Sequence, residues 1–213
     1  MMERIVLIGG GGHCKSMIDV ICRQGAYEIA AITDQRDRIG QILCGFQVNY
    51  TDDDLESLYA AGIRMAAVSV GGIGDFSLRA RLYKRAAEIG FQFPMICDPS
   101  AVVSVHTRIG DGVFIGKLCV VNAGTDIQSM AIINTGAIVE HDCRIGAFAF
   151  LSPAVTLSGG VTVGEHMHIG TGASIIQQVS IGAYSMIGAG SIVVKSMGDH
   201  VKAYGNPCRE VKK

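Results

Sequence analysis

A histidine followed directly by an aspartate, His141-Asp142, is the pair in this sequence best suited to acid–base chemistry. An unperturbed histidine has a pKa of about 6.5, so its imidazole can accept a proton near neutral pH. An adjacent carboxylate can orient the ring and stabilise the imidazolium that forms. The pair is therefore a candidate general base for acyl transfer to an amine or alcohol. An ordinary exposed histidine beside a solvated aspartate is the alternative.

The neighbouring cysteine is poorly placed to act as a nucleophile. Cys143 falls at a small, inward position of the repeat described below. Transfer at His141 would therefore pass directly from donor to acceptor without an acyl-enzyme.

The other histidines of the repeat do not suggest a metal site. His166 and His168 follow His141 by 25 and 27 residues, whereas residues of this repeat stack on one face only at multiples of eighteen. We therefore expect no metal.

Four consecutive glycines, Gly9 to Gly12, precede His13. Backbone N–H groups in such a turn can approach a diphosphate, and a following helix favours the anion. The third glycine of a dinucleotide fingerprint is absent, because Lys15 follows where it should lie. The turn suits a mononucleotide group better than NAD, with a simple tight turn as the alternative.

Alternating strands and helices surround this turn. Strands are predicted at 3–8, 27–33, 65–70 and 91–96, and helices at 15–23, 53–61 and about 75–89. This order predicts a small Rossmann-like parallel α/β sheet over residues 1–96, with ligands bound outside the carboxyl ends of its strands.

The remainder of the chain, residues 97–213, is dominated by a repeat. From Val103 to Val193 every sixth residue is Ile, Val or Leu, the residue four places later is mostly small, and glycine often follows the aliphatic residue directly. Such a pattern predicts short strands that turn a corner every six residues, with three strands in each triangular coil of a parallel β-helix. We expect the aliphatic side chains to fill the interior and the glycines to supply backbone freedom near the corners. Apolar residues on the flat outer faces predict association between subunits.

Composition excludes several partners. Lys and Arg number 18 against 19 Asp and Glu, with no long basic run, which argues against nucleic acid. No apolar stretch of eighteen residues and no signal-peptide pattern are present, so we expect no membrane partner. Seven cysteines without a C-x-x-C pair indicate reduced thiols and a cytoplasmic protein.

With these residues in view, the chain resembles the bacterial sugar O-acyltransferase family, which includes sialic acid O-acetyltransferases and nucleotide-4-aminosugar N-acetyltransferases. The resemblance covers essentially the whole chain. Its motifs are the glycine run with His13, Asp34, Arg79-Ala-Arg-Leu-Tyr, Phe93-Pro94, Asp98-Pro-Ser-Ala-Val-Val-Ser, the segment 134–143 and Tyr204-Gly-Asn-Pro.

The resemblance implies a left-handed β-helix, a homotrimer, acetyl-CoA as co-substrate in a groove between subunits, and a nucleotide-sugar acceptor bound by the N-terminal domain. It makes His141 the base and Asp142 its orienting carboxylate, with Asn134 as a polar contact that could reach a neighbouring subunit's site. Gly159, Ala189 and Pro207 become CoA-binding residues, and Gly12, His13 and Asp34 become acceptor-binding residues.

Two positions depart from the family pattern. Bacillosamine-pathway N-acetyltransferases have a second histidine nine residues after the base, where this chain has Phe150, and the loop 71–75 lacks a frequent asparagine. The favoured activity is N-acetylation of the 4-amino group of a nucleotide-linked 4-amino-6-deoxyhexose for bacterial surface glycan or glycoprotein synthesis. The alternatives are sugar O-acetylation of the sialic acid type and a non-catalytic trimeric scaffold.

Overall fold

The computed structural model describes residues 2–71 and 76–211, so most of the glycine-containing loop 71–75 lies outside the described residues. The chain divides into two compact units, Met1–Pro99 and Ser100–Lys213; the sequence placed the division between residues 96 and 97. Within the described ranges, no helix combines the length and the apolar character needed to cross a membrane.

The first unit is built on a four-stranded parallel sheet of order β5-β2-β1-β6. Its strands are β1 (Glu3–Ile8), β2 (Tyr27–Asp34), β5 (Tyr50–Thr51) and β6 (Met65–Val68). Residues Ile5 to Ile8 of the central strand are 0% exposed. An unbroken apolar run of this kind is expected where helices cover both faces of a parallel sheet.

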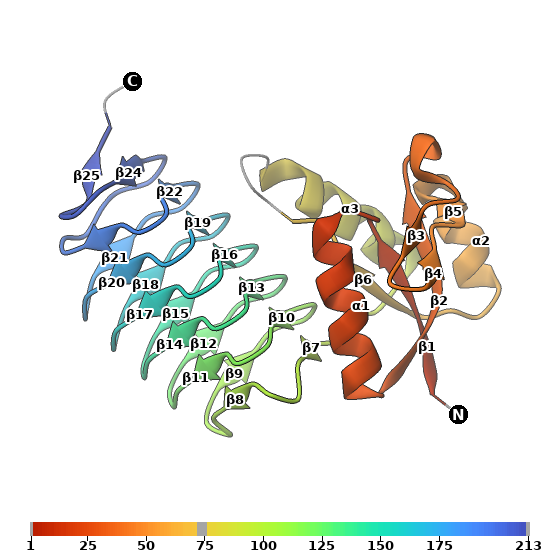
Figure 1. Cartoon of the computed structure of the whole chain (residues 1–213), viewed down its shortest axis with the longest axis horizontal. Coiled ribbons are helices and arrows are strands. Elements are labelled where there is room, and N and C mark those ends of the chain that lie inside the picture. The colour runs from red at the N-terminus through yellow and green to blue at the C-terminus, as the bar shows by residue number, and fades with distance from the viewer. Residues whose placement is uncertain (1, 72–75, 212–213) are drawn as a thin grey trace. The chain divides into compact units, whose positions relative to one another are not determined.

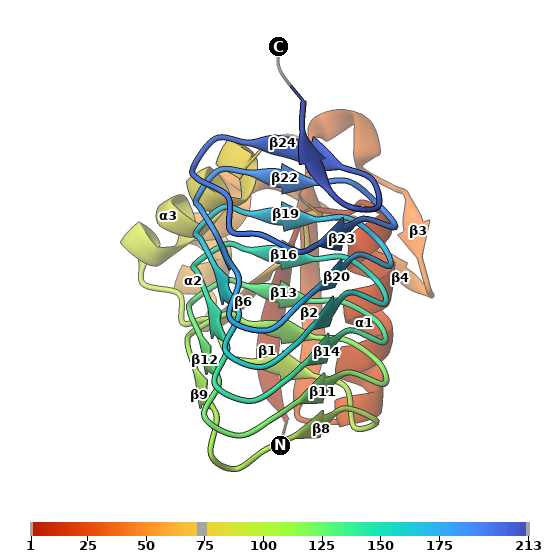
Figure 2. The ribbon, with the colours of Figure 1, turned by 90° about the vertical axis from the view of Figure 1, so that its left-hand side faces the viewer.

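Three helices cover the sheet: α1 (Gly12–Gln24), α2 (Leu55–Ala60) and α3 (Phe76–Ile89). Helix α1 lies on one side of the sheet, and α2 and α3 lie on the other (Figures 1 and 2). The buried residues of α1 fall on one face at helical spacing, and the helix is capped at its C-terminus by Gly25, whose φ of 68° is left-handed. The short 3-10 helices η1 (Arg36–Arg38) and η2 (Asp52–Asp54) complete the connections. The doubly wound prediction is confirmed.

Two local expectations for this unit differ from the structure. The strand predicted at 91–96 is wrong: Gln92 forms an isolated bridge with Met65, and only the end of the segment belongs to β7 (Ile96–Cys97). Pro94 has no N–H to donate to a ladder, which accounts for the interruption. A hairpin of β3 (Ile42–Leu43) and β4 (Phe46–Gln47) was not predicted. Its turn has positive φ at both Cys44 and Gly45.

The second unit is a left-handed parallel β-helix with three sheets, as the repeat and the resemblance predicted (Figure 2). We call its triangular body the prism. The first sheet contains β10 (Phe114–Ile115), β13 (Ile132–Ile133), β16 (Phe150–Leu151), β19 (His168–Ile169), β22 (Met186–Ile187) and β24 (Lys202–Tyr204), with β25 (Arg209–Glu210) antiparallel to β24. The second contains β8 (Val102–Val103), β11 (Val120–Val121), β14 (Ile138–Val139), β17 (Thr156–Leu157), β20 (Ser174–Ile175) and β23 (Ile192–Val193). The third contains β9 (Arg108–Ile109), β12 (Asp126–Ile127), β15 (Arg144–Ile145), β18 (Thr162–Val163) and β21 (Ser180–Ile181).

From β8 to β20, each strand of the prism pairs with the strand eighteen residues further on, whereas β22 pairs with β24 sixteen residues further on. Ile138 is aligned with Thr156 and Thr156 with Ser174, for example. From β8 to β23 the second residue of each strand is the predicted aliphatic one, and from Ile115 to Val193 all of these residues are buried. The hexad positions therefore form the continuous core of the prism.

The glycines that directly follow the aliphatic residues have a different role from the one predicted. Left-handed φ values occur instead three residues after the aliphatic residue, where non-glycine residues such as Leu118 and Gln178 also adopt them. At Gly146, Gly164 and Gly170, an added Cβ would lie about 2.5 Å from backbone atoms of the next coil: 2.5, 2.4 and 2.5 Å respectively. These glycines are required by close coil-to-coil approach and not by backbone freedom.

This explanation can be tested by replacing two glycines with alanine. Gly164→Ala places a Cβ 2.4 Å from the Ala183 nitrogen. We expect the free energy of unfolding to fall by more than about 3 kcal/mol, because a backbone atom cannot rotate away. Gly172 has a φ of +69°, but no atom lies within 4 Å of an added Cβ. Gly172→Ala should therefore lower the free energy of unfolding by only about 1 kcal/mol. Denaturant unfolding at equal protein concentration measures both. A larger loss for Gly172→Ala would restore the backbone-freedom explanation.

Candidate active site

The histidine–aspartate pair lies at the corner of the prism that follows β14. His141 Nδ1 is 2.8 Å from Asp142 Oδ2, and the two side chains are 65% and 71% exposed. With a carboxylate as its partner, Nδ1 carries the proton, which leaves Nε2 as the free acceptor. The geometry is that of an oriented imidazole that can take a proton from a group in solvent.

Neighbouring coils hold the backbone of this pair on both sides. The Asp142 N–H donates to the Ala123 carbonyl at 3.0 Å, and the Gly160 N–H donates to the His141 carbonyl at 2.9 Å. Asp142 adopts a left-handed φ of 60°, a conformation that aspartate tolerates better than most residues. The corner is therefore fixed by the same hydrogen bonds that stack the coils.

Cys143 is directed into the core, as its position in the repeat predicted. It is 0% exposed, and its Sγ donates to the Ser158 carbonyl at 3.3 Å. Burial raises the pKa of the Cys143 thiol, which disfavours the thiolate needed by a nucleophile.

Gly159 lies in the next coil, directly against the imidazole. A Cβ added at Gly159 would be 2.6 Å from His141 Nε2 and 2.7 Å from Cε1. The absent side chain leaves room for the ring at this position. Three predicted site residues, His141, Asp142 and Gly159, thus meet at one corner.

The remaining predicted residues of the prism lie at a different corner, the one that follows the strands of the first sheet. Asn134 follows β13, and its Oδ1 accepts the Thr135 N–H at 2.8 Å. Ala189 follows β22, further along the same corner, and its nitrogen would be 2.5 Å from a Cβ at Gly170. Pro207 lies between β24 and β25, where the adjacent Cys208 N–H donates to the Ile192 carbonyl at 2.8 Å. Within one chain, the structure does not bring Asn134 to His141.

Ring stacks account for the positions of the other histidines. Phe150, where the resemblance led us to expect a second histidine, is 7% exposed and stacks on His168 with centroids 5.2 Å apart. His168 Nε2 contacts Ser152 Oγ at 3.2 Å. His166 belongs to a separate ladder at another corner, between Phe148 and Tyr184, each 4.9 Å away. His166 and His168 thus contact rings on different columns, and the described residues hold no cluster of three potential metal ligands.

In the first unit, Asp34 closes the glycine turn. Its Oδ2 accepts the Gly10 N–H at 2.6 Å and its Oδ1 accepts the Gln35 N–H at 2.7 Å. Arg38 adds a hydrogen bond to the Gly10 carbonyl at 3.3 Å. The turn lies beside the carboxyl end of β6, where Ser69 Oγ donates to the Gly9 carbonyl at 2.5 Å. The strand order β5-β2-β1-β6 places the topological switch point between β1 and β6. Ligands of doubly wound sheets bind at such switch points.

The four glycines of the turn divide into two pairs. A Cβ at Gly9 would lie 2.3 Å from Val70 Cγ2, and one at Gly10 would lie 2.9 Å from Val48 Cγ2. Gly11 and Gly12 have no atom within 4 Å of an added Cβ. Gly9 and Gly10 therefore let Val70 and Val48 pack against the turn, whereas Gly11 and Gly12 leave open space at the start of α1.

His13 is held neutral beside a buried cation. Burial, together with the nearby Arg79 guanidinium, lowers the pKa of His13 to about 4. Arg79 of α3 is 4% exposed, and burial lowers its pKa to about 10, so it stays charged at neutral pH. In the sequence Arg79 stands out only as part of a motif, because its proximity to His13 depends on how α1 and α3 fold.

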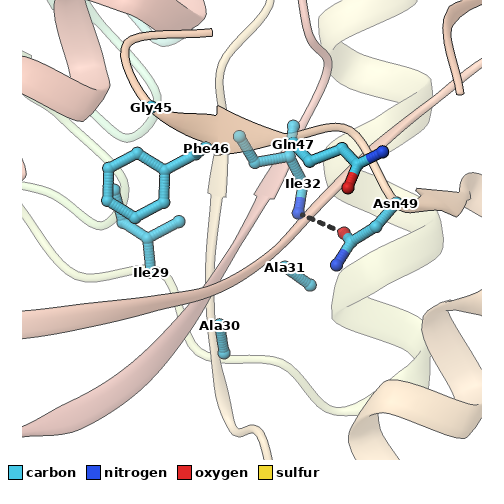
Figure 3. Close-up of a pocket in the computed structure, with 8 residues that line it drawn as sticks. All are labelled: Ile29, Ala30, Ala31, Ile32, Gly45, Phe46, Gln47 and Asn49. Atoms are coloured by element: carbon cyan, nitrogen blue, oxygen red, sulfur yellow. Dashed lines mark hydrogen bonds between the residues drawn. The ribbon is translucent and has the colours of Figure 1, made fainter. Parts of the chain in front are cut away.

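A hollow of about 190 Å³ lies along β2, between that strand and the β3–β4 hairpin (Figure 3). Ile29, Phe46, Gln47 and Asn49 are among its lining residues, and Asn49 Oδ1 accepts the Ile32 N–H at 3.4 Å. None of Gly12, His13 or Asp34 lines it.

Known protein families match both units. The PglD N-terminal domain matches residues 4–86, and the hexapeptide repeat of succinyl-transferase matches residues 106–139 and 136–177. No curated protein matches the sequence.

Solved structures match the entire chain. A histidine variant of perosamine N-acetyltransferase from Caulobacter crescentus, in complex with CoA and GDP-perosamine, is 40% identical over 100% of this chain and 99% of that chain, with a TM-score of 0.93. The acetyltransferase domain of PglB from Neisseria gonorrhoeae, in complex with acetyl coenzyme A, is 34% identical over 99% of this chain and 100% of that chain, with a TM-score of 0.92. WeeI from Acinetobacter baumannii is 25% identical over 99% and 100%, with a TM-score of 0.85.

The second unit is a prism of hexapeptide coils with an oriented histidine at one corner. The whole chain also matches acetyltransferases that were solved with CoA, and it is therefore an acyltransferase of the hexapeptide-repeat class. Within that class, the chain belongs to the sugar acyltransferase family of the nucleotide-aminosugar N-acetyltransferase type. The predicted resemblance is thereby confirmed, and the scaffold alternative is wrong.

The low pKa of His13 predicts an acid-sensitive stability. Between about pH 6.5 and pH 4, the unfolded chain binds a proton at His13 that the folded chain does not bind, so the free energy of unfolding falls as the pH falls. The full loss would be up to about 3 kcal/mol. His13→Asn should flatten this part of the stability profile, measured by denaturant midpoints across that pH range, whereas His106→Asn at an exposed histidine should not. An unchanged slope in His13→Asn would contradict the assignment.

Proposed function

We propose that the protein transfers the acetyl group of acetyl-CoA to the 4-amino group of a nucleotide-linked 4-amino-6-deoxyhexose. The observation that carries this proposal is the oriented pair, His141 Nδ1 at 2.8 Å from Asp142 Oδ2, in a chain similar over its full length to enzymes solved with CoA and GDP-perosamine. The similar enzymes solved with CoA and GDP-perosamine are N-acetyltransferases, so N-acetylation is favoured over O-acetylation. The product would serve bacterial surface glycan or glycoprotein synthesis.

In the proposed mechanism, His141 acts as the general base. The amine nitrogen attacks the thioester carbonyl, and Nε2 accepts the proton that the nitrogen loses. Asp142 keeps the proton of the neutral ring on Nδ1 and stabilises the imidazolium. As the C–S bond breaks, the imidazolium returns a proton to the departing CoA thiolate. The buried, protonated thiol of Cys143 supports direct transfer without an acyl-enzyme.

The acyl donor is expected to use two of the three corners of the prism, the one after the second sheet and the one after the first sheet. Gly159 lies against His141, and its backbone would contact the thioester, while Ala189 and Pro207 would line the CoA groove. Asn134 lies at the corner away from His141 of its own chain. Its predicted polar contact therefore requires a neighbouring subunit, which links the site to a homotrimer.

The acceptor is expected to bind at the carboxyl ends of β1, β2 and β6. The open space at Gly11 and Gly12 would admit the diphosphate to the N-terminus of α1. His13 would offer an uncharged imidazole there, with the Arg79 cation nearby. Asp34 would act by holding the glycine turn, because both of its oxygens accept backbone N–H groups.

Free thiols at all seven cysteines fit a cytoplasmic enzyme, where thiols stay reduced. Acetyl-CoA and the nucleotide sugar are its expected small-molecule partners, with no metal required.

Replacement of the proposed base tests the function directly. His141→Ala should lower kcat for N-acetylation of GDP-perosamine about 10²–10⁴-fold, the usual contribution of a positioned proton acceptor. KM for acetyl-CoA should change little, because the ring acts on the acceptor. Asp142→Asn should lower kcat less, because the imidazole remains. Steady-state kinetics with a panel of nucleotide aminosugars and hydroxyl sugars checks these expectations, and an undiminished kcat in His141→Ala would eliminate the mechanism.

A homotrimer is expected in solution. The second sheet presents apolar residues outward, including Val102 at 66% exposed, and Leu118 at a corner is 68% exposed. Burial of such side chains between prisms is favourable, at roughly 25 cal/mol per Å². Light scattering at micromolar concentration should give three times the mass of one chain. A monomer would rule out the inter-subunit CoA groove.

A further inference from the structure

Two glycines from neighbouring coils flank the histidine–aspartate pair. Gly124 lies one coil before Asp142, and Gly159 lies one coil after His141. Gly159 adjoins the imidazole, as described above. Gly124 adjoins the carboxylate, and nothing in the sequence distinguishes it from the other glycines of the repeat.

The Asp142 carboxylate occupies the space that a side chain at Gly124 would fill. A Cβ added at Gly124 would lie 2.3 Å from Asp142 Oδ1 and 3.3 Å from Cγ. The other oxygen, Oδ2, is 2.8 Å from His141 Nδ1. The carboxylate thus rests against Gly124 through one oxygen while it orients the ring through the other.

Backbone conformation alone does not explain glycine at position 124. Its φ is +76°, but the same left-handed conformation is adopted at the equivalent position of the following coils by Asp142 at 60° and Gln178 at 58°. Non-glycine residues are therefore tolerated along this corner. The contact with the Asp142 carboxylate is what distinguishes position 124.

We propose that Gly124 is a positioning residue for the general base: its lack of a side chain lets the Asp142 carboxylate lie where it orients His141. This proposal rests on the proposed function of the pair. Gly124 itself touches neither substrate, and it acts through Asp142.

The matched control is Gly172. It is also exposed, also left-handed with a φ of +69°, and also donates its N–H to the previous coil, at 3.0 Å to the Pro153 carbonyl, against 3.2 Å from Gly124 to the His106 carbonyl. A Cβ at Gly172 has no atom within 4 Å. Gly124→Ala and Gly172→Ala should therefore lower the melting temperature similarly, and differ in catalysis.

We expect Gly124→Ala to lower kcat about 10²-fold, the effect of displacing a catalytic group by about 1 Å. KM for acetyl-CoA and for the aminosugar should stay within about twofold, and Gly172→Ala should keep kcat within about twofold of wild type. In an Asp142→Gly background, Gly124→Ala should have no further effect, because the displaced group is gone. A general structural defect would instead lower kcat in both backgrounds and overturn the proposal.

A crystal structure of Gly124→Ala separates this proposal from the proposed function. We expect the Asp142 carboxylate to leave hydrogen-bond distance of His141 Nδ1. A carboxylate that remains in place, or a kcat equal to that of Gly172→Ala, would overturn the role of Gly124 and leave the proposed reaction intact. Absence of transfer by the wild-type enzyme to any nucleotide aminosugar would overturn the proposed function, and the crystal structure would still decide the geometry.

Discussion

Hydrogen bonding between coils eighteen residues apart is the constraint on which the second unit depends. Each short strand satisfies its backbone groups through the strands above and below it, so the three sheets share one spacing. The same bonds fix the corners, including the Asp142 N–H to the Ala123 carbonyl. The proposed catalytic pair on this exposed corner can therefore be held in place without being buried, because its backbone belongs to the ladder.

The prism could be predicted from the sequence because its period is short and unbroken. An inward aliphatic residue every sixth position determines strand, core and coil length together. The role of the glycines could not be predicted, because close approach to the next coil depends on distances in three dimensions. In the first unit, β1 and its flanking helices could be predicted from apolar runs. The Ile42–Gln47 hairpin could not, because it depends on two positive φ angles and cysteine at position 44 does not indicate one.

The candidate site likewise contains residues that the sequence could predict and residues that it could not. His141 and Asp142 were predictable because they are adjacent in the chain, and adjacency at a corner placed their side chains in contact. Gly124, and the proximity of Arg79 to His13, were not predictable, because each depends on residues distant in sequence. Asn134 became a candidate only through the family resemblance. It lies at another corner from His141, so within one chain it does not contribute to the same site.

Because every coil presents the same three corners, the prism is modular. Duplication or loss of one complete coil beyond Gly159 would preserve the alignment of strands on either side of the change and leave the coils that carry Gly124, Asp142 and Gly159 untouched. The length of the proposed CoA groove could thus evolve independently of the proposed proton-transfer site. Insertions whose length is not a multiple of eighteen residues would move later residues to the wrong corner, so the repeat accepts only whole coils.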